Sequence, residues 1–557
     1  MKRSVLVMLV SLVLICSLLL ISCSSSTTSS TTTTTPTTTS APPVTSTTST
    51  APPVTTTTTK PPTSTTQPPP PVTSTTAAPI TTAARPAPTG TLKVAQQTFS
   101  YETFDQNDGE AFWGYMVQDP LVTYTKAGDY TGVLAESWAL SPDGLQWTFK
   151  IRKNVKFTNG DPLTAQDVAF SIDHFIAPDS KNPWSPYLRN NFAGYSVPDD
   201  YTYIYKTKTP EPPLIISFQD VNILPKNYIQ AHGWDYYKAN PIGSGPWKLN
   251  SFTSKTQITF DVNMDYWGNK PYYAHVQELL VPEESTRIAM LKRGDVDIIG
   301  ALSTDRTVEL QAQGYTLQAI GLPTDQVVSW QGTWLTTGPT KDINFRKAMS
   351  YAINRQEMAD TFYKGLAVPG GRWFMYPGSY GWDPTWKADP YDPALVKTLL
   401  AAAGYPSKFA NPVITLIAQA GPYADFMQVL QGYWTAAGIQ TKIKVVDTQG
   451  YLGLMFVRNT DPNGANVGDV MPWIYPVVFN AIYHSANMYQ SNGVHSTGND
   501  PQADALYKKA TTELDPVKAK QYWTDFLNYG YGMWVNTGIC TLPSYWVEGP
   551  KVGAWGD

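Results

Sequence analysis

Apolar and polar residues alternate in short segments of the first half of this chain. Residues 147–151 (WTFKI) and 155–157 (VKF) alternate in this way. Period-two alternation is typical of strands with one buried face, so both segments are predicted to be short strands. The segment 90–104 (GTLKVAQQTFSYETF) predicts a first strand followed by a loop.

A helical pattern follows the second of these strands. Val168, Ile172 and Phe175 recur at the spacing of a single helix face. Thr164 precedes this stripe, and Asp167 lies three residues after Thr164, which is the pattern of a capping box. A capped helix is therefore predicted to begin just after Thr164.

The second half of the chain alternates between helical and strand patterns. Apolar residues in 345–353 recur at i, i+3, i+4, i+7 and i+8, which predicts a buried helix face. Asn354, with Glu357 three residues later, is predicted to cap the next helix. Residues 392–404 begin with Asp-Pro and end with Gly, which are common helix borders, whereas residues 438–446 (GIQTKIKVV) alternate as a strand. Helices interleaved with strands favour an α/β fold.

The N-terminus has the pattern of a secretory signal. Residues 1–3 are Met-Lys-Arg, and residues 5–21 are almost all apolar. This run is shorter than the ~20 apolar residues of a membrane span, so residues 1–22 are predicted to be a signal peptide. An uncleaved signal anchor is the alternative. Residues 20–23 (LISC) resemble a bacterial lipobox, which implies that Cys23 is lipidated.

Residues 23–90 are predicted to be the lipidated cysteine followed by a disordered linker. After Cys23 the segment is rich in Ser, Thr, Pro and Ala, and Lys60 and Arg85 are its charged residues. Such a composition offers little apolar surface to bury, so it favours disorder with partial polyproline character. We expect it to act as a tether that holds the folded part away from a membrane or wall.

Residues 91–557 form the predicted folded part, which is long enough for two or three domains. The chain has 40 Lys and Arg and 44 Asp and Glu; four of the basic and none of the acidic residues precede residue 91, so the folded part carries a formal charge of −8. This charge argues against a nucleic-acid partner. Cys540 is the single cysteine of the folded part, and we expect it to be buried and inert.

The sequence contains no recognisable catalytic constellation. It has no G-x-S-x-G, H-E-x-x-H, Walker-type or C-x-x-C motif. His484 and His495 are the closest pair of the five histidines, and their spacing is not that of a metal site. The chain is therefore predicted not to be an enzyme and to use no metal or cofactor. Aromatic residues make up 13% of the chain, which suits a cleft that binds ligands by stacking.

One long stretch of sequence resembles a known family. Residues 134–175 (LAESWALSPDGLQWTFKIRKNVKFTNGDPLTAQDVAFSIDHF) closely resemble the signature of the extracellular solute-binding proteins of peptide and nickel ABC importers, family 5. Residues 242–249 (IGSGPWKL), 266–267 (YW) and 290–298 (MLKRGDVDI) also follow the order of that family. The resemblance therefore covers the whole folded part.

The resemblance implies an α/β fold of the two-lobed periplasmic-binding-protein type, cluster C, with a central ligand cleft. Residues 91–325 and 526–557 would form the first lobe, which includes a small subdomain around the signature. Residues 326–525 would form the second lobe. Two crossings between the lobes would act as a hinge.

Ligand contacts are inferred from family position. They lie after the first strand, in the glycine turn, at the end of a second-lobe strand and in two later aromatic segments. The residues are Gln96, Gln97, Thr98, Gly243, Ser244, Gly245, Ser329, Trp330, Gln331, Trp373, Asp469, Trp473 and Tyr475. Core packing is the alternative for each tryptophan, and a plain turn is the alternative for the glycines.

The segment 469–479 (DVMPWIYPVVF) departs from the peptide-binding relatives. They place an Asp directly before the tyrosine to pair with the ligand's α-amine, whereas this chain has Ile474. A buried ammonium without a carboxylate is strongly disfavoured. Either Asp469 reaches in from a shifted loop, or the ligand has no α-amine at this point.

These observations predict the substrate-binding component of an ABC importer. It would capture an oligopeptide or related organic solute by lobe closure and deliver it to permease subunits. We expect a monomer outside the cytoplasm that touches the membrane through its lipid anchor only. The alternatives are an oligosaccharide-binding protein of the same fold, a solute sensor for a signalling receptor, and a secreted hydrolase on a stalk.

Overall fold

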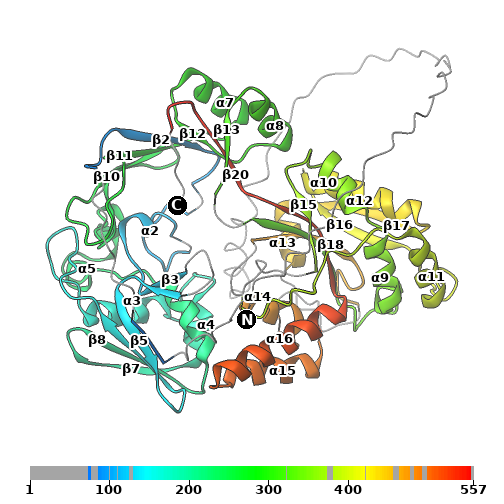
Figure 1. The fold of residues 1–557 in the computed structure, drawn as a ribbon, viewed down its shortest axis with the longest axis horizontal. Helices are drawn as coiled ribbons and strands as arrows, with labels where there is room; N and C mark the ends of the chain where they lie inside the picture. The colour runs from blue at the N-terminus through cyan, green and yellow to red at the C-terminus, as the bar shows by residue number, and fades with distance from the viewer. Residues whose placement is uncertain are drawn as a thin grey trace, which may run out of the picture. The chain divides into compact units, whose positions relative to one another are not determined.

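The computed structural model of this chain has mixed α/β architecture (Figure 1). Its described part contains three large β-sheets and one two-stranded sheet. In that part no helix is both long and apolar enough to cross a membrane. The described residues are 73–76, 86–99, 101–109, 111–124, 130–320, 323–372, 380–420, 422–455, 463–476, 482–491, 493 and 499–552.

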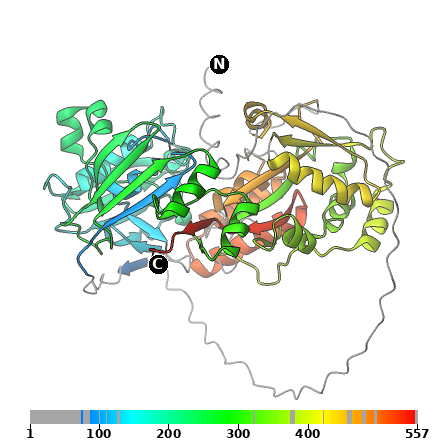
Figure 2. The same cartoon turned by 90° about the horizontal axis from the view of Figure 1, so that it is seen from above.

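The first lobe is built on a seven-stranded sheet in which segments far apart in sequence are neighbours. Figure 2 shows the blue strand β2 inserted among green strands from the middle of the chain. In spatial order the strands are β13 (Thr316–Ala319), β20 (Tyr545–Glu548), β12 (Ile298–Ile299), β2 (Thr91–Gln96), β11 (His275–Leu280), β10 (Gln257–Val262) and β9 (Trp247–Thr253). Helices α7 (Glu284–Arg293) and α8 (Thr304–Ala312) contribute Leu291 and Leu310 to an apolar cluster with Ala95 of β2.

The small subdomain contains the sequence signature. Its sheet has the order β1 (Thr73–Thr76), β5 (Ala135–Leu140), β6 (Gln146–Ile151), β8 (Thr202–Thr207) and β7 (Phe192–Asp199). Its other elements, with those that join it to the first lobe, are α2 (Gly114–Val117), β3 (Val122–Tyr124), β4 (Tyr130–Gly132), α3 (Ala165–Phe175), α4 (Ser185–Asn191), η2 (Pro212–Gln219), α5 (Lys226–His232) and α6 (Trp234–Ala239).

The predicted strand 147–151 and the predicted capped helix are confirmed. The backbone N–H of Thr164 donates to Asp167 Oδ2 at 2.8 Å, as a capping box requires. Val168, Ile172 and Phe175 are fully buried on the inner face of α3. The predicted strand 155–157 is wrong, because Lys156 makes only an isolated bridge to Pro162.

Part of the predicted disordered linker is ordered. Strand β1 pairs antiparallel with β5, with Thr73 opposite Ala139 and Thr76 opposite Ser137. Threonine is β-branched and favours strands. The threonine-rich segment 73–76 (TSTT) therefore adds a strand next to β5 at the edge of the small sheet.

The second lobe is a six-stranded sheet with helices on both faces. The strand order is β15 (Val368–Pro369), β19 (Asn536–Leu542), β14 (Thr324–Trp330), β18 (Val470–Pro476), β16 (Ile414–Gln419) and β17 (Thr441–Val446). Residues of α9 (Ile343–Tyr351), α10 (Arg355–Thr361), α11 (Pro393–Ala403) and α12 (Pro422–Ala436) share one buried cluster with Val328 and Trp330. Residues of α13 (Thr448–Met455), α14 (Ile482–Tyr489), α15 (Pro501–Thr512) and α16 (Pro516–Met533) share another with Val327 and Trp473. A short 3-10 helix, η3 (Pro339–Lys341), precedes α9.

The capping residues predicted for the second lobe are in place. The side chain of Asn354 accepts from the backbone N–H of Glu357 at 3.2 Å, and that of Asp392 accepts from Leu395 at 2.9 Å. Gly404 ends α11 with φ +73°, a conformation that suits glycine. Cys540 is fully buried, as predicted.

The chain passes between the two lobe sheets at two places. Strand β13 belongs to the first-lobe sheet and β14 to the second, so one crossing lies at residues 320–323. Strand β19 belongs to the second-lobe sheet and β20 to the first, so the other lies at residues 543–544. The predicted boundary between 525 and 526 falls inside α16 and is therefore corrected. The periodicity of that helix shows no break, so no local pattern marks the later position of the boundary.

Candidate functional site

The parallel strands of the first-lobe sheet all end at the edge from which the chain leaves for the second lobe. Strands β11 and β12 run parallel to β2. Strand β20 is antiparallel to both β12 and β13, so β13 runs in the same direction as β2. Because β13 leads directly into the crossing at 320–323, the carboxyl ends of these strands lie at the crossing edge.

The second-lobe sheet has the same relation to the crossings. Strands β17 and β18 run parallel to β16, and β14 runs antiparallel to β18. Because β14 begins at the crossing, the carboxyl ends of the three parallel strands also lie there. In open α/β sheets, ligands bind outside the carboxyl ends of the strands. The two carboxyl edges are therefore the candidate site.

Three predicted contact residues lie at the first-lobe carboxyl edge. They are Gln96, Gln97 and Thr98, at the end of β2. Gln96 Nε2 donates to Glu278 Oε2 at 2.9 Å, so this amide binds its own lobe. The Oε1 atom of Gln97 is buried and accepts no hydrogen bond from the described residues, which leaves Gln97 able to bind a donor.

Glu278 was not singled out by the sequence. Burial raises the pKa of its carboxyl to about 7, although a hydrogen bond from Trp113 opposes the shift. Its Oε2 accepts from Trp113 Nε1 at 3.4 Å as well as from Gln96. Glu278 thereby holds the loop that contains Trp113 to the sheet.

Arg287 fixes the backbone at the same edge. Its guanidinium donates to the carbonyls of Val281 and Pro282 after β11, both at 2.7 Å, and to those of Gly300 and Ala301 after β12, at 3.2 and 2.7 Å. The residue is 1% exposed, and burial lowers the pKa of the guanidinium. Arg287 therefore positions two loops of the candidate site.

Tyr475 and Asp325 pair at the second-lobe carboxyl edge. They are register partners on β18 and β14, although the side chain of Tyr475 is outside the described residues. Asp325 is 1% exposed; its Oδ1 accepts from Thr541 Oγ1, and its Oδ2 has no hydrogen-bond partner in the part of the chain that the structure describes. Burial raises the pKa of this carboxyl to about 7, against the opposing hydrogen bond from Thr541. The carboxylate of Asp325 on the strand segment 324–330 (TDQVVSW) was the signal that sequence reasoning missed.

Two of the predicted tryptophans of the second lobe, Trp330 and Trp473, lie on opposite faces of the sheet. Trp473 pairs with Val327 and belongs to the cluster under α13–α16, where it is 1% exposed. Trp330 belongs to the cluster under α9–α12 and is fully buried. Side chains alternate along a strand, so Trp330 also faces away from its neighbours Ser329 and Gln331. The structure therefore does not bring these tryptophans together.

Ser329, Gln331 and Asp469 lie at the far edge of the second-lobe sheet. The N–H of Gln331 donates to the Asp469 carbonyl at 2.9 Å, next to the start of β18. Asp469 is six residues from Tyr475, which is roughly 20 Å along a strand. Burial raises the pKa of Asp469 to about 6, while a hydrogen bond from Thr415 opposes the shift. This geometry disfavours a role for Asp469 beside Tyr475.

The glycine turn at 243–245 lies at the amino end of β9. Strand β9 runs in the same direction as β2, so the turn is at the edge opposite Gln96. Ser244 Oγ donates to the buried Asp119 at 2.9 Å, and a Cβ at Gly243 would lie 2.1 Å from the Val117 carbonyl oxygen. These contacts favour the alternative given for the glycines, a structural turn rather than a ligand contact.

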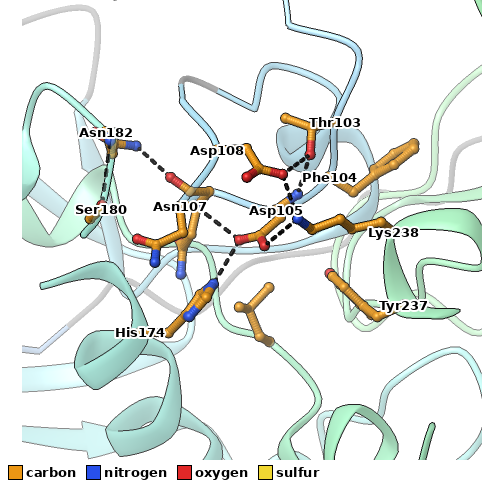
Figure 3. Close-up of polar contacts among 12 residues, drawn as sticks. Thr103, Phe104, Asp105, Asn107, Asp108, His174, Ser180, Asn182, Tyr237 and Lys238 are labelled. Atoms are coloured by element: carbon orange, nitrogen blue, oxygen red, sulfur yellow. Dashed lines mark hydrogen bonds and ion pairs between the residues drawn. The ribbon is translucent and has the colours of Figure 1, made fainter. Parts of the chain in front are cut away.

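A polar cluster fixes the loop that follows β2 (Figure 3). Asp105 Oδ1 accepts from His174 Nε2 at 2.7 Å and from the Asn107 N–H at 2.9 Å, while Lys238 Nζ lies 2.7 Å from Asp108 and 3.4 Å from Asp105. Burial alone would raise the pKa of Asp105, but the hydrogen bond and charge of His174 outweigh it and lower the pKa. The cluster ties the loop to α3 and α6, and so supports the first-lobe edge.

The remaining predicted positions are outside the described residues. Trp373, Cys23 and His495 are among them, as is the side chain of His484. Within the described part, no group of three or more His, Cys, Asp or Glu residues is arranged to hold a metal ion.

Comparison with known proteins gives matches over much of the chain. The chain is 27% identical to the dipeptide-binding protein of Escherichia coli (strain K12) over 357 residues, which cover 57% of this chain and 64% of that protein. It is 28% identical to the nickel-binding periplasmic protein of the same strain over 305 residues, which cover 52% of this chain and 56% of that protein. The chain thus spans less than two thirds of the length of these relatives.

The fold is similar to that of NikA from Brucella suis in complex with Fe(III)-EDTA. The TM-score is 0.72 at 22% identity, and the match covers 84% of this chain and 96% of NikA. This likeness confirms the predicted two-lobed α/β fold. Residues 129–490 match the family described as bacterial extracellular solute-binding proteins, family 5 (middle). The chain therefore belongs to the family 5 bacterial extracellular solute-binding proteins.

Proposed function

We propose that this chain is the solute-binding component of an ABC importer. It captures a solute between the carboxyl edges of its two lobe sheets and presents it to permease subunits. One observation carries the proposal beyond family membership: in both lobes the parallel strands end at the crossing edge, so the two edges can bind opposite sides of one solute.

The solute is an oligopeptide or a related organic molecule with several hydrogen-bonding groups. The described groups at the edges that support this are the Gln97 amide oxygen and the Asp325 carboxyl, which each have an unused acceptor. One relative is a dipeptide-binding protein, and NikA was solved with Fe(III)-EDTA. Both of those ligands are small and rich in polar atoms.

The protein acts outside the cytoplasm as a lipid-anchored monomer. The apolar run 5–21 and the lipobox-like residues 20–23 support export and lipidation of Cys23. Such an anchor places the solute site next to permease subunits in the same membrane. Members of this family are binding proteins, which supports a role in capture rather than catalysis.

Native mass spectrometry of the purified full chain tests the proposal. We expect a bound organic molecule of defined mass that is released when the protein is unfolded. Titration with the released compound should then give saturable binding at one site. Hydrolysis of peptides or oligosaccharides by the purified chain would contradict the proposal, and so would the absence of any saturable small-molecule binding.

A further inference from the structure

We propose that a contact between the small subdomain and the second-lobe helices α14 and α15 is a latch that sets solute affinity from outside the solute site. The inference rests on the solute-binding function proposed above. The latch has three parts: a hydrogen bond at Tyr187, an apolar contact at Ile216 and a close approach at Gly144.

The hydrogen bond joins residues that are 300 positions apart. Asn487 Nδ2, on α14, donates to the hydroxyl of Tyr187, on α4, at 3.0 Å. The Tyr187 hydroxyl is largely removed from water, and burial raises its pKa. This hydrogen bond is partly buried, and it is lost when the two parts separate at this point.

The apolar contact inserts the small subdomain into the second-lobe core. Ile216, on η2, is 7% exposed and belongs to the buried cluster that contains Ala510 of α15 and Phe526 of α16. Tyr124 and Tyr130 of the two-stranded sheet pack against the same cluster. Separation of the lobes at this point would return this apolar surface to water, which is unfavourable.

The third part is a close approach at a turn of the small subdomain. A Cβ at Gly144, in the turn between β5 and β6, would lie 2.6 Å from Leu514 Cδ2, just after α15. Gly144 also has φ +73°, so any larger residue would be strained there. The absence of a side chain at this turn permits the contact with Leu514.

Contacts made only when the lobes are closed act on affinity through the conformational equilibrium. A solute that touches both lobes binds the closed form. Its apparent affinity is therefore its affinity for the closed form multiplied by the fraction of molecules that are closed. Loss of the latch should therefore weaken binding of every solute by a similar factor. Loss of a residue in the solute site should instead affect different solutes unequally.

The test measures the distance between the lobes directly. Spin labels are placed on the full chain at Gln166→Cys in the small subdomain and Val517→Cys on α16, both exposed positions. Pulsed electron resonance then compares the parent with Tyr187→Phe, Leu514→Ala and Ile216→Asp. Ile343→Asp, an exposed isoleucine of the second lobe, is the matched control. Melting temperatures confirm that each variant is folded.

We expect the latch variants, but not the control, to move population from a short to a longer distance. Apparent affinities for tri-L-alanine and for Fe(III)-EDTA, where either binds, should fall by about 3- to 30-fold and by similar factors. Unchanged distances in folded Tyr187→Phe and Leu514→Ala would overturn the latch. If the latch variants shift the distance as expected but neither solute binds, the proposed solute classes are contradicted while the latch remains supported.

Discussion

At the scale of single residues, Asp325 is a buried carboxyl of the second lobe whose hydrogen bonding is incomplete. It is 1% exposed, and one of its carboxylate oxygens has no partner among the described residues. A buried carboxyl in that condition destabilises the fold whenever it is ionised. Its position beside Tyr475 at the carboxyl edge gives a functional reason to keep it.

Asp325→Asn should therefore stabilise the protein above neutral pH. Burial raises the pKa of the folded-state carboxyl to about 7, well above the ordinary value of an aspartate, so the folded form holds its proton more tightly. Stability of the parent is then highest below the unfolded pKa and falls as pH rises through about 7. Urea unfolding of both proteins at about pH 5 and about pH 8 should show a smaller pH-dependent loss in the variant.

Asp235→Asn, at an exposed position, is the matched control and should leave that loss unchanged. An equal loss in Asp325→Asn and the parent would show that the carboxyl is not buried in its ionised form.

Trp473→Ala should act mainly on stability. The ring lies in the cluster under α13–α16 at 1% exposure, and truncation of a core Trp to Ala costs about 3–5 kcal/mol. Denaturant unfolding measures this cost. A normal unfolding midpoint together with weakened solute binding would restore the sequence-based interpretation of Trp473 as a ligand contact.

Residue roles were harder to predict than residue burial. The position of Gln96–Thr98 at a carboxyl edge follows from the sequence, because a first strand ends there. Ser329–Gln331 also end a strand, but β14 runs against its parallel neighbours, so its end is at the far edge. Strand direction depends on long-range pairing, which local pattern does not reveal.

At the scale of elements, the guanidinium of Arg287 positions two loops of the candidate site through hydrogen bonds to their backbone carbonyls. Arg287→Met should remove hydrogen bonds to four carbonyls and leave buried acceptors unpaired, at a cost of about 2–4 kcal/mol. Thermal unfolding should show the loss. Arg293→Met, on the same helix with an exposed side chain, should change the midpoint little, and a similar change in both variants would contradict the assigned role.

Helices were predicted better than strands. Asn354, Asp392 and Thr164 start helices as expected, because a cap is a local interaction between a side chain and nearby backbone. The segment 155–157 has strand periodicity but no neighbouring strand to pair with. Periodicity reports burial of alternate residues, and pairing needs a partner elsewhere in the chain.

At the scale of the whole molecule, the two carboxyl edges should respond together. Addition of the solute identified by mass spectrometry should slow amide exchange at residues 96–99 and at residues 474 and 475 at once, because one solute bridges both edges. Residues 243–245 and 329–331, at the opposite edges, should be unaffected. Protection confined to 329–331, which is one of the sequence-predicted contact segments, would contradict the topological argument.

The two-lobed architecture followed from the resemblance, whereas the second crossing did not. A crossing is defined by which sheet each flanking strand joins, and both β19 and β20 pair with strands that lie over two hundred residues earlier. Such pairing has no local signature. The helix α16 obscured the boundary because it continues without a break across residues 525 and 526.

Arg346 repeats in the second lobe what Arg287 does in the first. Its guanidinium donates to the carbonyls of Thr340, Lys341, Met533 and Trp534. Every residue has a backbone carbonyl, whatever its side chain. An arginine that donates only to carbonyls therefore does not constrain the amino-acid identity of the residues it binds. Substitutions in loops that are held in this way leave these hydrogen bonds in place. The same fold can therefore evolve to bind new solutes without losing the interactions that position its loops.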